Sequence, residues 1–265
     1  MRVVSAGVLL VVIFGTLWFL PPWATVLLAA GAAWLAAGEL AAIAAHVGVV
    51  VPSMVVGSAA AVVSVAFLAS AEGTPAGALA AVLLALIVAA GAVALALGPP
   101  NPSVIGRAAL LVMAPLYTGL PLGAISWVLC FHGPAAATWL LVMIAVSDSG
   151  QYYCGRAFGR RKLAPAVSPA KTVEGAVGGV VVAVVVGAAT GTWALPGVSI
   201  AALAVLTLAL ALAGIVGDLF ESLLKRSAGV KDSSHLIPGH GGVLDRIDSH
   251  LFAAPVFYLF LRYIA

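Results

Sequence analysis

Acidic, basic and glycine residues crowd one short segment near the C-terminal end of the chain, from Gly217 to Ser249. One helix face is predicted to carry four polar residues spaced at i, i+3, i+4 and i+7: Asp218, Glu221, Ser222 and Lys225. Asp218 also ends an apolar run, where an ionised carboxylate is costly unless it is paired or bound to a cation. The spacing therefore predicts a charged site at the end of an apolar helix.

A glycine-rich stretch follows this predicted helix, at residues 238–242. Its members are Pro238, Gly239, His240, Gly241 and Gly242. This composition cannot continue a helix, and its glycines let backbone N–H groups approach an anion closely. We expect a phosphate-binding loop here, with the next helix beginning near Leu244.

Two carboxylates lie in the first turn of that next helix. Asp245 and Asp248 are three residues apart and share one helix face. Neighbouring carboxylates repel each other unless a cation lies between them. Mg²⁺ binds through one or two carboxylates, with water and substrate phosphates completing its shell. Together with the adjacent lysines and arginines, these residues predict a site for metal-bound nucleotide phosphates.

Structural roles are the alternative for each residue taken alone. Asp245 could cap a helix, where the dipole favours an acid. Lys225 and Arg226 could anchor a helix end among lipid headgroups, and Asp218 could form a salt bridge inside the membrane. The density of these residues in a chain otherwise almost free of charge favours a functional site.

A second group of polar residues lies upstream. Asp148 ends an apolar run, a basic cluster follows at 156–162, and Lys171 begins the next run. The basic cluster alone is typical of a topology signal. Lys171 fits either a phosphate ligand or a helix start.

The composition determines which elements must position these residues. Hydrophobic residues make up 63% of the 265 and charged residues 8%, and the mean hydropathy is +1.20. Soluble domains carry about 25% charged residues. The apolar runs are also much longer than the strands of a membrane barrel, which are roughly 10 residues. These values predict an all-α, polytopic integral membrane protein, with about nine transmembrane helices.

The predicted spans form a single transmembrane domain over 1–265, with an N-terminal half at 1–133 and a catalytic half at 134–265. The stretches are roughly 3–20, 22–45, 47–70, 75–98, 104–130, 134–155, 172–194, 197–220 and 244–264. Basic residues concentrate in two connections, about 156–171 and 221–243, which the positive-inside tendency makes cytoplasmic. Cys130 and Cys154 then face opposite ends of the membrane, which excludes a disulfide between them.

The C-terminal run resembles the signature of the phosphatidate cytidylyltransferases (CDP-diacylglycerol synthases). The matching positions are Ser222, Lys225, Arg226, Lys231, Asp232, Pro238, Gly239, His240, Gly241, Gly242, Asp245, Arg246 and Asp248. The Asp148 and Lys171 segments are similar to two upstream motifs of that family, but Gln151 stands where the family usually has alanine. The resemblance implies that CTP and phosphatidic acid give CDP-diacylglycerol and pyrophosphate.

The resemblance also implies a role for each residue. Asp218, Asp245 and Asp248 are expected to bind Mg²⁺, alone or with a second cation, and Lys225, Arg226, Lys231 and Arg246 to contact phosphates. Gly239, His240, Gly241 and Gly242 would shape the phosphate loop. Asp148, Lys171 and Ser222 would form the opposite wall.

Two other functions compete with this interpretation. A CTP-dependent lipid-alcohol kinase would use the same donor, and a secondary transporter would also carry intramembrane acids. The expected partners are CTP, phosphatidic acid and the bilayer of a cell (plasma or inner) membrane, with the active site on the cytoplasmic face and no nucleic acid. The resemblance further suggests a homodimer. Glu39, within the second apolar run, has no role that the sequence indicates.

Overall fold

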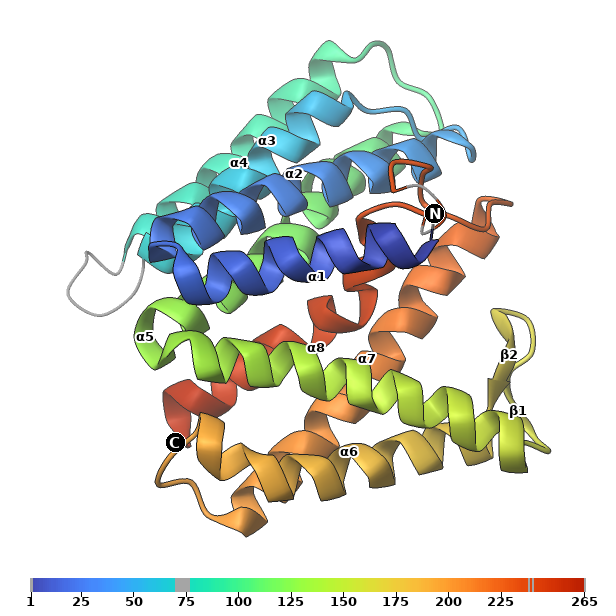
Figure 1. Ribbon diagram of the computed structural model, residues 1–265. Helices are drawn as coiled ribbons and strands as arrows, with labels where there is room; N and C mark the ends of the chain where they lie inside the picture. The colour runs from blue at the N-terminus through green and yellow to red at the C-terminus, as the bar shows by residue number, and fades with distance from the viewer. Residues whose placement is uncertain (1, 70–76, 238, 240, 265) are drawn as a thin grey trace. The chain divides into compact units, whose positions relative to one another are not determined.

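The computed structural model describes residues 2–69, 77–237, 239 and 241–264, and most of these residues are helical (Figure 1). The all-α prediction is therefore confirmed, with one small β-hairpin added. The elements are α1 (Arg2–Phe19), α2 (Pro22–Ala45), α3 (Ser53–Ala69), α4 (Gly77–Ala96), α5 (Val104–Phe158), β1 (Lys162–Ala164), β2 (Ser168–Thr172), α6 (Val173–Ala194), α7 (Ile200–Ser227) and α8 (Leu244–Tyr263).

Five of the described helices, α2, α4, α5, α6 and α7, are long and apolar enough to cross a membrane. The count of about nine spans stays a prediction. Two predicted stretches, 104–130 and 134–155, lie within α5, which is kinked at Gly133, where φ is 82°. Only glycine adopts this left-handed conformation readily, so it allows the chain to turn between two helical segments.

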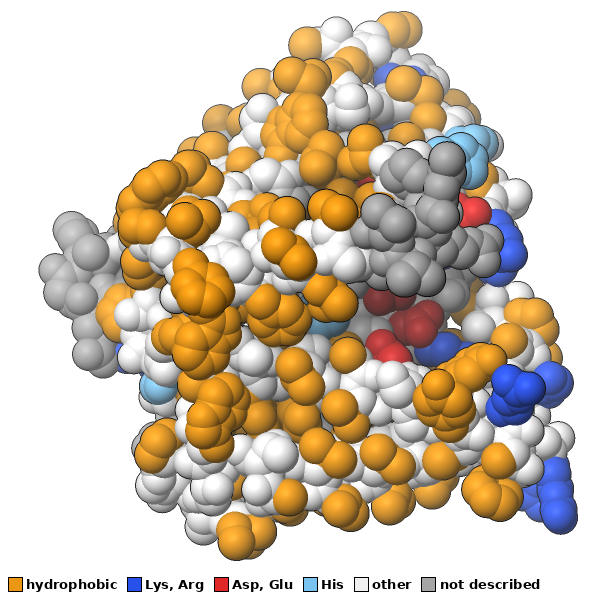
Figure 2. Space-filling model, in the orientation of Figure 1, with side chains coloured by type: hydrophobic (Ala, Val, Ile, Leu, Met, Phe, Trp, Pro, Cys, Tyr) orange, Lys and Arg blue, Asp and Glu red, His pale blue; other side chains and the backbone are white. Residues whose placement is uncertain are grey.

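The surface supports a lipid environment. Phe19, Leu95 and Ile105 each expose more than four fifths of their area, at 86%, 82% and 83%. Figure 2 shows hydrophobic side chains spread over the face in view. A soluble protein rarely exposes large continuous apolar areas, whereas lipid covers such an area without cost.

The chain divides into two compact units, and the first comprises residues 1–130 and 224–247. Within it, α1 packs on α2, α2 on α3 and α3 on α4 (Figure 1). Small side chains permit this packing: Ala33, Ala36 and Ala60 have no exposed area. The first part of α5 joins them, because the Thr118 hydroxyl donates to the Ala33 carbonyl at 3.3 Å.

The second unit comprises residues 131–223 and 248–265. The second part of α5 lies against α6, and a Cβ added at Gly150 would be 2.9 Å from the Cα of Gly179. Trp139 connects three elements, since its indole N–H donates to Thr190 at 3.2 Å and its ring lies 5.8 Å from that of Phe257. This unit therefore has its own packed interior.

A β-hairpin occupies much of the predicted 156–171 loop. Its strands pair antiparallel, with Lys162 opposite Thr172. The Thr172 side chain then accepts the Gly175 N–H at 3.1 Å and caps α6. Lys171 thus lies on the strand that leads directly into α6, next to its cap Thr172, and the predicted start of a helix there is confirmed. The second predicted loop, 221–243, is also shorter than expected, because α7 continues to Ser227.

Candidate functional site

A lysine and a carboxylate from the signature segment form an ion pair in the first unit. Lys225 lies in the last turn of α7, and Asp245 lies in the first turn of α8. The Lys225 Nζ is 2.5 Å from Asp245 Oδ1, and the two side chains are only 11% and 6% exposed. The pair is therefore largely shielded from water. Charge–charge interactions are stronger in such a low-dielectric environment than in water.

The other oxygen of Asp245 binds the loop that precedes α8. Asp245 Oδ2 accepts the Ser233 N–H and hydroxyl, both at 2.9 Å, and the Gly242 N–H at 2.8 Å. Asp245 begins α8, which is not among the five candidate spans. Burial raises the pKa of Asp245, but hydrogen bonds from Lys225, Gly242 and Ser233 outweigh burial and lower it to about 2. Asp245 is therefore ionised at neutral pH.

Glu39 of α2 binds the same loop from the other side. Its Oε1 accepts the Val243 N–H at 3.0 Å and the Ser234 hydroxyl at 2.7 Å. Its Oε2 accepts the Leu244 N–H at 2.8 Å and the Ser233 hydroxyl at 2.9 Å. The side chain that had no role in the sequence is thus the N-terminal cap of α8, provided by another helix.

Two glycines are required where this loop meets the carboxylates. Gly241 has φ +76°, and a Cβ there would collide with Asp245 Oδ2. A Cβ at Gly242 would collide with the Ser233 hydroxyl and with Glu39 Oε2. The glycine-rich composition therefore serves the close approach of the backbone to two carboxylates of the protein itself. Its predicted contact with substrate phosphate stays a prediction.

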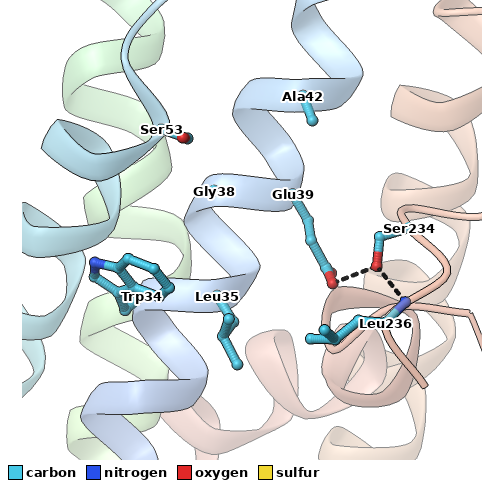
Figure 3. Close-up of a pocket in the computed structure, with 8 residues that line it drawn as sticks. All are labelled: Trp34, Leu35, Gly38, Glu39, Ala42, Ser53, Ser234 and Leu236. Carbon is cyan, nitrogen blue, oxygen red and sulfur yellow. Dashed lines mark hydrogen bonds between the residues drawn. The ribbon is translucent and has the colours of Figure 1, made fainter.

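A pocket of about 410 Å³ adjoins the Glu39 side chain (Figure 3). Ser234 lies between Glu39 and Leu236, because its hydroxyl donates to Glu39 and also accepts the Leu236 N–H at 3.2 Å. The pocket is lined by Trp34, Leu35, Gly38, Glu39, Ala42, Ser53, Ser234 and Leu236.

The second unit contains a separate charged cluster formed by three predicted residues. Lys171 of β2 forms an ion pair with Asp218 of α7. Asp148 of α5 interacts electrostatically with both of them. Ser222 lies one turn after Asp218, and its hydroxyl donates to Asp218 Oδ1 over 3.4 Å. Asp148, Lys171 and Ser222, expected to form one wall of the site, thus lie around Asp218, which was expected to bind a metal ion together with Asp245 and Asp248.

Gln151 completes this cluster. Its side-chain amide donates to Asp148 Oδ1 at 3.0 Å. An alanine, the residue usual in the family that the sequence resembles, could not make this bond. In this chain, Gln151 therefore provides a hydrogen-bond donor to Asp148 at a position where the family pattern has a small side chain without one.

The remaining predicted residues are more exposed or make local contacts. Arg226, Lys231 and Arg246 are exposed, and the Arg226 guanidinium donates to the Val230 carbonyl at 3.3 Å. Asp248 Oδ1 accepts the Ser249 N–H at 2.6 Å. Gly239 has a left-handed φ of 79°, as a tight turn requires. His240 lies outside the described residues.

The described carboxylates could provide two ligands to a magnesium ion at one place, but not three. Among the residues that the structure describes, no three His, Cys, Asp or Glu side chains gather into a metal-binding group. In the second unit, however, Asp148 and Asp218 are both close to Lys171. This donor set suits Mg²⁺, which is commonly bound by one or two carboxylates and by phosphate oxygens.

Glu39 and Ser233 are the residues that sequence reasoning missed. A signal for Glu39 existed, since an acid within an apolar helix must find donors or a cation. Its partners could not be identified, because they lie almost two hundred residues away and are two ordinary serines and two backbone N–H groups.

Comparisons with known proteins bear on the chemistry. A family model described as "Cytidylyltransferase family" matches residues 1–264. Among curated proteins, a "Phosphatidate cytidylyltransferase" of Haemophilus influenzae is 44% identical over 51% of this chain and 48% of its own length. Proteins of that name from Helicobacter pylori and Bacillus subtilis are 44% and 42% identical, over 56% and 54% of this chain. The chain spans about half the length of these relatives, at 48%, 55% and 57%.

Proposed function

Since this chain belongs to the cytidylyltransferase family, we propose that it transfers CMP from CTP to phosphatidic acid, giving CDP-diacylglycerol and pyrophosphate. The observation that carries the proposal is the shielded Lys225–Asp245 pair, which sets a cation and a carboxylate of the signature segment beside a glycine loop. The names of the matched relatives support the same substrates.

The proposed reaction displaces one oxyanion by another. A phosphate oxygen of phosphatidic acid attacks the α-phosphorus of CTP, an oxygen–phosphorus bond forms, and the bond to pyrophosphate breaks. Because the attacking oxygen is already anionic, no proton has to be removed from it. Both reactants are negatively charged, so the main requirement is to neutralise charge in the transition state. Lys225, Arg226, Lys231 and Arg246 are the proposed phosphate-contacting residues, and Gly239, His240, Gly241 and Gly242 the proposed phosphate loop.

The second charged cluster is proposed to bind substrate as well. Lys171 is the residue suited to a phosphate there, while Asp148 and Ser222 orient the group around it. A lysine held between two carboxylates is already positioned when an anion arrives, which lowers the entropy lost on binding.

Magnesium is the proposed cofactor, alone or with a second cation. Asp218, Asp245 and Asp248 are the candidate ligands, each considered singly, because no three such side chains gather into one group among the described residues. When bound, the ion supplies Lewis-acid neutralisation of the phosphate oxygens. Both oxygens of Asp245 receive protein donors, so this carboxylate would have to exchange some of them for a metal.

The environment of the protein follows from its substrates. Five apolar helices support a multi-pass membrane protein, in which a lipid headgroup can meet a water-soluble nucleotide at the interface. We propose a cell membrane location with the active site on the cytoplasmic face, where the basic connections lie by the positive-inside tendency. A homodimer is proposed from the family resemblance alone.

Labelled CTP tests this function. The protein, purified in detergent, is given CTP labelled at the α-phosphate, phosphatidic acid and Mg²⁺, and label is followed into the lipid phase. Label in the lipid, lost in Asp245→Asn, is the expected result. Label in a polyprenol or other lipid alcohol from γ-labelled CTP, with no α-label transferred to phosphatidic acid, would contradict the proposal and indicate a lipid-alcohol kinase.

A further inference from the structure

Glu39 and the loop before α8 are joined by an unusually complete set of hydrogen bonds. Each carboxylate oxygen accepts one backbone N–H and lies within hydrogen-bond distance of one serine hydroxyl. The side chain is 7% exposed, so these donors replace the water that an ionised carboxylate needs. Hydrogen bonds to a charged acceptor are roughly twice as strong as those between neutral groups.

The partners of Glu39 are the backbone groups that begin α8. An acid near a helix N-terminus also interacts favourably with the helix dipole. A cap normally comes from the residue just before the helix, and it then orders only the local turn. Here the cap belongs to α2, so it also fixes the start of α8 relative to a different helix of the same unit.

Ser233 connects Glu39 to Asp245. Its hydroxyl oxygen lies 2.9 Å from Glu39 Oε2 and 2.9 Å from Asp245 Oδ2. A serine hydroxyl has one hydrogen, so it donates to only one of these carboxylates at a time. Ser233 therefore links the two carboxylates, because its hydroxyl can donate to either of them.

We infer that Glu39 is a positioning residue: it holds Ser233, Ser234 and the start of α8, which carries Asp245, in the conformation that CMP transfer requires. The effect of Glu39 on CMP transfer rests on the proposed function. The hydrogen bonds of Glu39 are observed whether or not that function holds. Glu39 itself touches no substrate in this scheme. It acts through Ser233, Ser234 and the first N–H groups of α8.

Glutamine is the informative replacement for Glu39, because it keeps the size of the side chain. Whichever way the amide is turned, its NH₂ group faces a backbone N–H, that of Val243 or that of Leu244. Two donors cannot bond to each other. Glu39→Gln should therefore break the hydrogen bond to one of these two N–H groups. Because the side-chain volume is unchanged, any effect of the variant comes from lost hydrogen bonding and not from a cavity.

The experiment measures amide hydrogen exchange and kinetics on the full chain in detergent. Exchange is followed in peptides covering 231–247 and, for comparison, α3 and α4. Glu39→Gln should speed exchange in 231–247 by about tenfold or more, since a lost charged hydrogen bond has that effect on local opening. It should lower kcat by about tenfold to hundredfold, with a smaller change in KM for CTP, because small misplacements cost that much.

Two controls make the result specific. Ser64→Ala, at an equally buried site of α3, should change neither the exchange of 231–247 nor kcat. Glu174→Gln removes a different carboxylate that accepts the Arg160 and Arg161 N–H groups, so it should speed exchange there and not at 243–244. Ser234→Ala removes one donor with no change of charge. It should give a smaller effect in the same direction, and it decides the question if Glu39→Gln does not fold.

Either of two results would overturn the inference. One is unchanged exchange of 231–247 and unchanged kcat in Glu39→Gln. The other is faster exchange spread evenly over α3, α4 and 231–247, with kcat per folded molecule unchanged, which would make Glu39 a general stabilising residue. Exchange needs no substrate, so a wild-type protein without CMP transfer would refute the proposed function while the positioning of the segment is still tested.

Discussion

Glu39 accepts a hydrogen bond of 2.8 Å from the backbone N–H of Leu244, a residue 205 positions later in the chain. This bond makes α2 part of the structure that presents Asp245 and the glycine loop. The N-terminal half of the chain is therefore more than a membrane anchor, because the start of α8 depends on a residue it provides. Substitutions around this bond should alter both stability and CMP transfer.

Gly242→Ala should destabilise the protein. The added methyl group would collide with the Ser233 hydroxyl and the Glu39 carboxylate. Overpacking of this kind costs about 1–3 kcal/mol. We expect a lower unfolding midpoint in detergent, together with reduced CMP transfer, and both can be measured on the same preparation.

Gly31→Ala is the matched control, because Gly31 lies in α2 and a Cβ there meets nothing within 4 Å. Replacing an exposed helical glycine by alanine should stabilise the protein by about 0.5–1 kcal/mol. Equal midpoints for the two variants would mean that the contacts of Gly242 are not tight.

Lys225→Met should reduce CMP transfer by about hundredfold or more, since one lost charge-stabilising donor costs about that much. The variant also leaves Asp245 buried without its cation, so the unfolding midpoint should fall as well. Lys162→Met, the same change at an exposed residue of β1, should have little effect on either quantity. Similar rates for the two variants in the α-labelled CTP assay would remove Lys225 from the proposed site.

Sequence patterns predicted the elements that depend on local composition. The apolar runs became helices, and the helix carrying Asp218, Ser222 and Lys225 was expected from their spacing. The start of α8 at Leu244 was also predicted correctly, and the described glycines of the predicted loop, Gly239, Gly241 and Gly242, lie outside the helices. These features follow from nearest neighbours along the chain, where glycine, proline and periodicity act directly.

Long-range partners could not be predicted in the same way. Nothing local in Glu39 indicates Ser233 and Ser234 as its donors, because pairing across 194 residues depends on how the helices pack. The hairpin at Lys171 was missed because its strands are short and their residues are weak strand formers. The break between the predicted stretches 104–130 and 134–155 agrees with the non-helical backbone at Gly133. Of these features, only the partners of Glu39 depend on contacts between distant parts of the chain.

Lys171 and Asp218 should act as a unit in CMP transfer. Their side chains are in direct contact, and residues in contact have non-additive effects of about 0.5–3 kcal/mol. We expect Lys171→Met and Asp218→Asn each to reduce the rate strongly, and the double variant to lose less than the product of the two effects.

A second cycle, Lys162→Met with Asp218→Asn, provides the comparison for this pair. Lys162 lies on the neighbouring strand of the hairpin and is exposed, so its effect should simply add to that of Asp218. Additive effects in both cycles would show that the Lys171–Asp218 pair has no shared role in the reaction.

Mg²⁺ and CTP together should raise the unfolding midpoint of the wild-type protein, because a ligand that binds only the folded state stabilises it by RT ln(1 + [L]/Kd). At a CTP concentration one hundred times Kd this is about 2.7 kcal/mol. A chelator should remove the stabilisation and the CMP transfer together, and added Mg²⁺ should restore both. Asp245→Asn tests whether the loss depends on the proposed ligand, since its midpoint should respond less to Mg²⁺. A full Mg²⁺-dependent shift in Asp245→Asn would exclude this carboxylate as a ligand and leave Asp218 and Asp248 as the candidates.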